Sequence, residues 1–183
     1  IEYYNFNGNG TLGDQLGGLL DKISKIPNIS KIVGIFDRDS HVQTSDPGKA
    51  YKALGNNVFR FNLPPLSNDE RNLTDKICIE HYYSNAEIET VTDFGHLYMG
   101  KDFNHLGVSN DGMWYFENFA KNTSITTISI IDGGNSHLKK LNEAATIITK
   151  DDFADYVIGH PAEFDFSNFK NIFDILVEID KNE

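Results

Sequence analysis

Hydrophobic and polar residues alternate in blocks along the first third of the chain, and these blocks predict helices and strands in turn. Leucine and isoleucine at helical spacing predict an amphipathic helix over 14–25, which ends before Pro27. The apolar run 32–36 is too short for a helix and is typical of a parallel strand buried on both faces. Alternation over 57–63 predicts the next strand, which ends at two prolines.

Weaker patterns extend this order through the rest of the chain. They predict strands at 2–6 and 125–131 and helices at 48–54, 114–121, 150–158 and 167–179. The last helix should bury one face, formed by Phe169, Ile172, Phe173, Leu176 and Ile179. The predicted fold class is α/β, with a mainly parallel central sheet flanked by helices. We expect a core over 1–135, with an inserted loop or hairpin region at about 67–122, and an acidic helical extension over 136–183.

Composition limits the compartment and the partners. The single cysteine, Cys78, excludes an internal disulfide, and with no signal-peptide pattern at the first residues it favours the cytoplasm. The formal net charge of -11 argues against a broad nucleic-acid-binding face and against an anionic membrane surface. No apolar run is long enough to span a bilayer. An acidic pocket that binds metal is still compatible with a phosphodiester substrate.

Two aspartates, Asp37 and Asp39, follow the strand at 32–36. Ligands of open α/β sheets bind at the carboxyl ends of strands, so this is a candidate site. Two carboxylates so close together repel each other unless a cation lies between them, and an oxygen-rich site suits Mg²⁺ or Mn²⁺. The simpler alternative is a turn at the strand end with two solvated aspartates.

A glycine-rich stretch suggests a second interpretation of the role of Asp37. Gly8, Gly10 and Gly13 fit G-x-G-x-x-G, and Asp37 could then bind the ribose of a nicotinamide or flavin cofactor. However, the segment before the glycines is polar for a central strand, and this reading gives Asp39 no role. We therefore rank a dinucleotide site below a metal site.

Three segments together resemble a known family. Phe36–Asp39 ends a strand, Ile79–Tyr83 carries a glutamate, and Thr149–Ala154 carries a lysine followed by two acids. This combination resembles the TOPRIM domain, in the form found in nucleases of the overcoming-lysogenization-defect family of bacterial anti-phage defence. The resemblance covers most of the chain and implies a Mg²⁺-dependent endonuclease. It also implies a nucleic-acid substrate, either DNA or RNA, an ABC-type ATPase domain or subunit as partner, and a homo-oligomer of the full-length protein.

The resemblance assigns roles to four residues. It implies that Asp37 and Asp39 bind Mg²⁺ or Mn²⁺, that Glu80 assists a second metal ion, and that Lys150 faces the scissile phosphate. His81, beside Glu80, either hydrogen-bonds phosphate or is a packed surface residue. We interpret Cys78 as a small buried hydrophobic residue.

One feature of the family is absent from the sequence. The family's first strand ends in a glutamate followed by glycine, and this chain has no Glu-Gly pair, while Glu2 lies on the wrong strand. We therefore expect the sequence to begin inside the domain and the isolated chain to be weakly active or inactive.

Two other functions are compatible with the sequence. The first is a phosphatase of the haloacid-dehalogenase type, with Asp37 as nucleophile. That family expects a Thr or Val two positions after the second aspartate, and here Val42 is three positions after Asp39. The second is a degenerate TOPRIM module that acts as an assembly or recognition scaffold.

Overall fold

The computed structural model describes residues 12–38, 44–68, 70–90, 92–99, 130–131 and 147–181. The chain forms two compact units, one of residues 1–82 with 167–183 and the other of 83–166, and each is considered separately below. The domain boundary predicted at 135/136 lies outside the described residues, as do the predicted strand 2–6 and helix 114–121. No described helix has the length and apolar character needed to cross a membrane.

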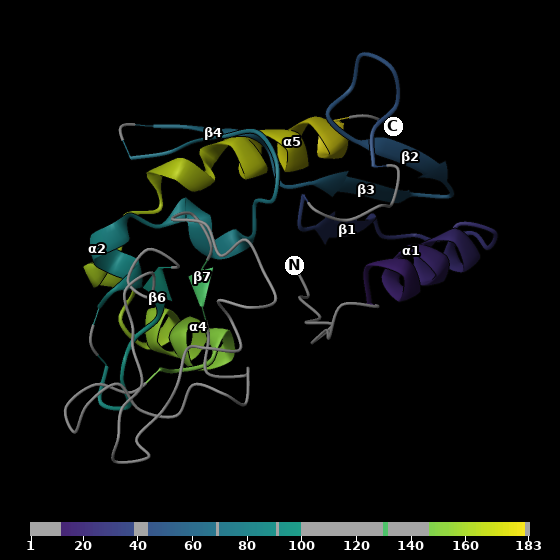
Figure 1. The fold of residues 1–183 in the computed structure, drawn as a ribbon. Helices are drawn as coiled ribbons and strands as arrows, with labels where there is room; N and C mark the ends of the chain where they lie inside the picture. Colours follow the sequence, from purple (N-terminus) through teal and green to yellow (C-terminus); the bar gives the residue numbers. More distant parts are fainter. Residues whose placement is uncertain are drawn as a thin grey trace, which may run out of the picture. The chain divides into compact units, whose positions relative to one another are not determined.

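The first unit contains a small mixed sheet with helices, which confirms the α/β class (Figure 1). Its strand order is β1 (Ile32–Phe36), β3 (Val58–Asn62), β2 (Lys52–Gly55). β1 runs parallel to β3, from Ile32 opposite Val58 to Phe36 opposite Asn62. β2 is antiparallel to β3. The parallel pair was predicted from the sequence.

The predicted helix over 48–54 is wrong, because this segment leads into β2. Gly55, Asn56 and Asn57 all have positive φ, at 97°, 48° and 62°. Two consecutive central residues with φ > 0 make the tight turn that joins antiparallel strands of a hairpin. Asn56 and Asn57 therefore reverse the chain between β2 and β3.

The prediction that 32–36 is buried on both faces is also wrong for the described part of the sheet. β1 lies at the edge of that sheet, and Ile35 is 41% exposed, whereas Gly34 and Phe36 are buried. The central strand is β3, in which four consecutive residues from Val58 to Phe61 are buried. An apolar run alone does not distinguish a central strand from an edge strand.

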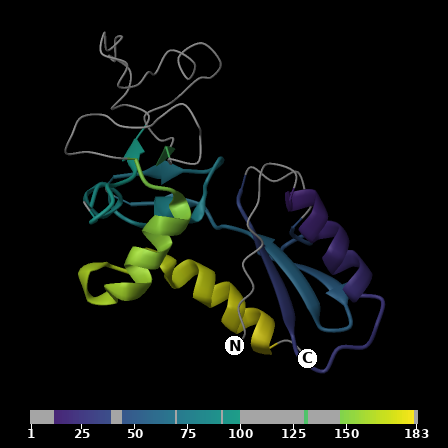
Figure 2. The ribbon, with the colours of Figure 1, turned by 90° about the horizontal axis from the view of Figure 1, so that it is seen from below.

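Helices lie on both sides of the sheet in this unit (Figures 1 and 2). On one side, α1 (Leu12–Ile23) buries Leu20 against Phe36 and Val58, as the helical spacing predicted. Gly34 allows this close approach, because a Cβ at this position would lie 2.3 Å from Cδ1 of Leu20.

On the other side lies α5 (Lys170–Lys181), which follows the short 3-10 helix η4 (Ser167–Phe169). Lys31 Nζ donates a 3.1 Å hydrogen bond to the carbonyl oxygen of Ile179 near the end of α5. The residues that α5 buries are Ile172, Ile175 and Ile179. The predicted buried face is therefore partly wrong, since Phe173 is 58% exposed.

After β3, the first unit continues with short elements. The strands β4 (Leu66–Ser67) and β5 (Asn72–Leu73) form an antiparallel pair, and the 3-10 helix η1 (Ile79–Tyr82) follows. The fully buried Tyr82 donates a 2.7 Å hydrogen bond from its hydroxyl to the carbonyl oxygen of Pro64. This bond fixes η1 against the segment that leaves β3.

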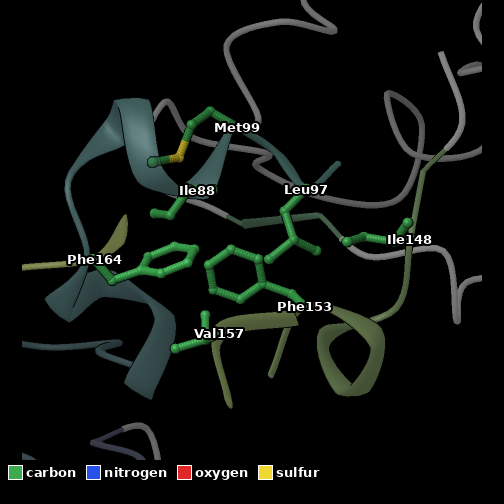
Figure 3. Packing of buried hydrophobic residues seen from close by; sticks show 7 residues of the cluster. All are labelled: Ile88, Leu97, Met99, Ile148, Phe153, Val157 and Phe164. Carbon is green, nitrogen blue, oxygen red and sulfur yellow. The ribbon is translucent and has the colours of Figure 1, made fainter. Parts of the chain in front are cut away.

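The second unit contains α2 (Asn85–Ile88), β6 (Tyr98–Met99), β7 (Ile130–Ile131), α4 (Lys150–Gly159) and the 3-10 helix η3 (Pro161–Glu163). It has its own hydrophobic cluster, shown in Figure 3 and formed by Ile88, Leu97, Met99, Ile148, Phe153, Val157 and Phe164. The predicted strand 125–131 is described only over β7, which pairs antiparallel with β6. Its predicted place in the parallel sheet is therefore wrong.

Candidate functional site

The carboxyl end of β1 places Asp37 at the edge of the parallel pair. The backbone N–H of Leu63 donates to the carbonyl oxygen of Phe36 at 2.9 Å, so the pairing continues one residue beyond Asn62. The next residue, Asp37, is exposed. This is the edge at which parallel α/β sheets bind ligands. Asp39, the other aspartate of the predicted pair, lies outside the described residues.

Arg38 connects this strand end to the segment that leads to Glu80. Its backbone N–H donates to the carbonyl oxygen of Ile77 at 2.9 Å. Its guanidinium donates from Nε to the carbonyl oxygen of Thr74 at 2.5 Å and from Nη1 to that of Leu63 at 3.0 Å. A planar guanidinium holds such donors in a fixed fork, so one residue fixes three stretches of backbone together.

Glu80 is in the first turn of η1, three residues after Ile77, and only 7% of its surface is exposed. The structure therefore brings the chain segments of Asp37 and Glu80 together. A buried carboxylate keeps its charge only where hydrogen-bond donors or a cation compensate for the lost water. Carboxylate oxygens are also the ligands that Mg²⁺ and Mn²⁺ prefer, so the residue types at this strand end fit the predicted metal.

His81 and Cys78 form a contact that sequence reasoning missed. The Nδ1 atom of His81 accepts a hydrogen bond from the backbone N–H of Cys78 at 3.1 Å and lies 3.0 Å from its Sγ. His81 is buried and Cys78 is half-buried, so neither a surface histidine nor a fully buried thiol describes them correctly. The i, i+3 spacing of a cysteine and a histidine was the available signal for a contact within one turn.

Lys150 is the first residue of α4, in the second unit. Thr149 caps this helix: its Oγ1 accepts from the backbone N–H of Asp152, and the Asp152 carboxylate accepts from the backbone N–H of Thr149, both at 3.0 Å. This capping box fixes where α4 begins. Because Lys150 and Asp37 belong to different units, the role of Lys150 beside the predicted metal site stays a prediction.

A pocket of about 420 Å³ lies at the same end of the parallel pair, and no pattern in the sequence predicted it. Its polar lining comes from Arg38 after β1, Asn62 at the end of β3, and the segment 44–50. The complete lining is Arg38, Thr44, Ser45, Lys49, Ala50, Asn62, Pro64, Pro65 and Ile175. Two cationic side chains in this lining favour an anionic ligand.

The charge of Arg38 also acts on a buried neighbour. Burial raises the pKa of the Tyr82 hydroxyl strongly, and the positive charge of Arg38 opposes this shift in pKa. The charge of Arg38 therefore acts on the buried phenol as well as on the pocket that it lines.

Within the described ranges, no group of three or more His, Cys, Asp or Glu side chains is arranged to hold a metal ion. Asp39, one of the three predicted ligands, lies outside those ranges, so this finding does not test the predicted set. Comparison with protein-family models, with curated proteins and with solved structures gives no match to this chain.

Proposed function

We propose that the chain is a TOPRIM-like nuclease module that hydrolyses phosphodiester bonds in DNA, or RNA, with Mg²⁺ or Mn²⁺. The main support is the hydrogen bond from the Arg38 N–H to the Ile77 carbonyl oxygen. This bond holds the segment of Glu80 beside the strand end that carries Asp37. It supports the proposal because the chain segments of two acids far apart in sequence lie side by side at the edge where parallel sheets bind ligands.

Each predicted site residue has a role in this proposal. Asp37, Asp39 and Glu80 hold the divalent ions through carboxylate oxygens. When bound, such ions supply an activated water and stabilise charge on the phosphate oxygens. Lys150 neutralises part of the negative charge that develops during hydrolysis. The resemblance to the defence nucleases further supports an ABC-type ATPase domain or subunit as partner and a homo-oligomer, and the single cysteine supports a cytoplasmic location.

The cations of the pocket remove one objection to a nucleic-acid substrate. The net charge of -11 repels a phosphodiester backbone at long range. Arg38 and Lys49, however, place positive charge at the candidate site itself. Screening by salt at physiological ionic strength leaves this local attraction to act over roughly 8 Å.

Nicking of supercoiled plasmid DNA tests the proposal. We expect slow nicking that requires Mn²⁺ or Mg²⁺, because the chain has no Glu-Gly pair to supply the family's first glutamate. Asp37→Ala should lower the rate by at least about a hundredfold, as loss of a catalytic group commonly does. The control is Asp174→Ala, which removes an exposed acid from α5.

Three results would contradict the nuclease assignment. Equal nicking by the parent chain and by Asp37→Ala would place the chemistry elsewhere. Release of phosphate from a small monoester, without nicking, would favour the phosphatase. Absence of both activities, with stable binding of an ATPase partner, would favour the scaffold.

A further inference from the structure

The pocket at the end of the parallel pair combines three kinds of surface. Arg38 and Lys49 provide positive charge, Asn62 provides a hydrogen-bond acceptor, and two prolines with Ile175 provide an apolar wall. Most of the surface that lines the pocket is polar, which suits a polar or charged ligand. All the lining residues belong to the first unit.

The cationic side of the pocket is suited to a phosphate group. Arg38 uses Nε and Nη1 to hold backbone carbonyl oxygens, and its Nη2 donates to no residue that the structure describes. Lys49 Nζ lies 5.4 Å from the ring centroid of Tyr51, a cation–π contact that orients the ammonium. A phosphate between these two side chains would receive charge-assisted hydrogen bonds from both.

Asn62 indicates that the ligand is more than a phosphate. Its Oδ1 atom is buried and has no hydrogen-bond partner among the described residues. A buried acceptor without a partner is unfavourable, and native structures contain few of them. The phosphodiester group of a nucleic acid cannot satisfy this oxygen, because it has no O–H or N–H and acts only as an acceptor. The ligand must therefore also carry an N–H or O–H donor.

The apolar wall and the volume complete the description. Pro64, Pro65 and Ile175 offer a surface against which a flat ring can pack. The volume of about 420 Å³ lies in the range of small-molecule and cofactor sites. A single nucleotide has all three required parts: a phosphate, a flat ring and N–H or O–H donors.

We propose that this pocket binds one nucleotide unit, with the phosphate on Arg38 and Lys49 and a base or sugar donor on Asn62 Oδ1. The proposal rests on the proposed function in that the nucleotide belongs to the nucleic-acid substrate. It names the part of the substrate that the first unit recognises next to the strand end of Asp37.

Isothermal titration calorimetry of the full chain in EDTA tests this proposal, with AMP, inorganic phosphate and adenosine as separate probes. We expect AMP to bind at least about tenfold more tightly than phosphate or adenosine, because only AMP engages the whole pocket. Lys49→Met should weaken the binding of both AMP and phosphate by about fivefold or more, as expected for loss of a charged hydrogen bond. Asn62→Ala should weaken the binding of AMP but not that of phosphate.

One control variant and one stability measurement make these results specific. Lys25→Met removes the same charge from an exposed residue that does not line the pocket, and it should change nothing. Asn62→Ala removes an unsatisfied acceptor, so its melting temperature should not fall. Equal binding of AMP and phosphate, or unchanged AMP binding in Lys49→Met, would overturn the nucleotide site.

A short single-stranded DNA then identifies the source of the nucleotide. Displacement of AMP by the DNA supports a unit of the substrate, and failure of the DNA to compete overturns the link to the substrate. AMP binding is measured in EDTA and nicking in a separate assay with Mn²⁺, so AMP binding without Mn²⁺-dependent nicking would keep the pocket and count against the nuclease. Nicking without AMP binding would keep the nuclease and reject the nucleotide pocket.

Discussion

The backbone N–H of Arg38 donates a 2.9 Å hydrogen bond to the carbonyl oxygen of Ile77. The two residues are 39 positions apart in sequence, and their bond joins the end of β1 to the segment that leads into η1. The side chain of Arg38 reinforces this junction through the carbonyl oxygens of Thr74 and Leu63. The geometry of the candidate site therefore depends on the guanidinium of one arginine.

Arg38→Lys tests this dependence while conserving charge. A lysine cannot reproduce the fork that holds two carbonyl oxygens, so we expect a loss of about 1 kcal/mol in the free energy of unfolding. Urea denaturation measures the change. The control Lys25→Arg alters an exposed cation and should leave stability within about 0.5 kcal/mol of the parent chain. Equal stability of Arg38→Lys and the control would show that the side-chain bonds do not support the junction.

Gly34→Ala tests the packing of α1 on β1. The new Cβ would lie 2.3 Å from Cδ1 of Leu20, which is buried, so the helix or the leucine must shift. Overpacking of this kind costs about 1–3 kcal/mol of stability. Gly18→Ala is the matched control: nothing lies within 4 Å of its added Cβ, and alanine favours the helix by roughly 1 kcal/mol. In thermal unfolding, the melting temperature should fall for Gly34→Ala and rise for Gly18→Ala.

Tyr82→Phe tests the effect of burial on the phenol. Burial raises the pKa of Tyr82 above its unfolded value of about 10, so the folded state disfavours the phenolate. Its contribution to stability is complete below about pH 10 and decreases above it, by at most about 1.4 kcal/mol per pH unit. Tyr82→Phe should lower the free energy of unfolding by about 1 kcal/mol near neutral pH, because it removes the hydrogen bond to the Pro64 carbonyl oxygen. In alkali, the free energy of unfolding should fall less steeply with pH for this variant than for the parent chain. Urea unfolding at neutral and alkaline pH measures both effects. The same dependence of the free energy of unfolding on pH in Tyr82→Phe and in the parent chain would contradict the effect of burial.

Lys150→Met and Thr149→Ala separate the predicted chemistry of α4 from its stability. Thr149→Ala removes the cap of the helix and should cost about 1 kcal/mol of stability. Lys150→Met should leave stability nearly unchanged and lower the nicking rate by at least about a hundredfold, because it removes a cation from the reacting phosphate. Lys170→Met, which removes an exposed lysine paired with Asp174 on α5, is the control for charge. Unchanged nicking by Lys150→Met would exclude this lysine from the site.

The sequence predicted the elements whose side chains follow one clear period. The helix at Leu12–Ile23, the strand at Ile32–Phe36 and the helix at Lys150–Gly159 differ from their predictions by two residues at most. For the helix at Leu12–Ile23 the pattern also agrees with the burial of Leu20, whereas for the strand only the bounds agree, because Ile35 is 41% exposed. The prediction from sequence was wrong at β2, where the local composition resembled that of a helix. Positive φ at Asn56 and Asn57 produces a hairpin there instead.

The candidate site could be predicted only in part, for a physical reason. The position of Asp37 follows from the rule that ligands bind at carboxyl ends of parallel strands. The junction between Arg38 and Ile77, and the pocket beside it, depend on contacts between residues far apart in sequence, which periodicity does not encode. The same limitation explains why β7 was assigned to the parallel sheet although it pairs with β6.

Binding of Mn²⁺, followed by electron paramagnetic resonance, tests the central claim most directly. The claim is that Asp37, with Asp39 and Glu80, holds divalent metal at the end of β1. We expect the parent chain and Asp174→Ala to bind Mn²⁺ alike, and Asp37→Ala to bind it at least about tenfold more weakly, because it lacks a ligand. Equal affinity of Asp37→Ala and the parent chain would contradict the claim.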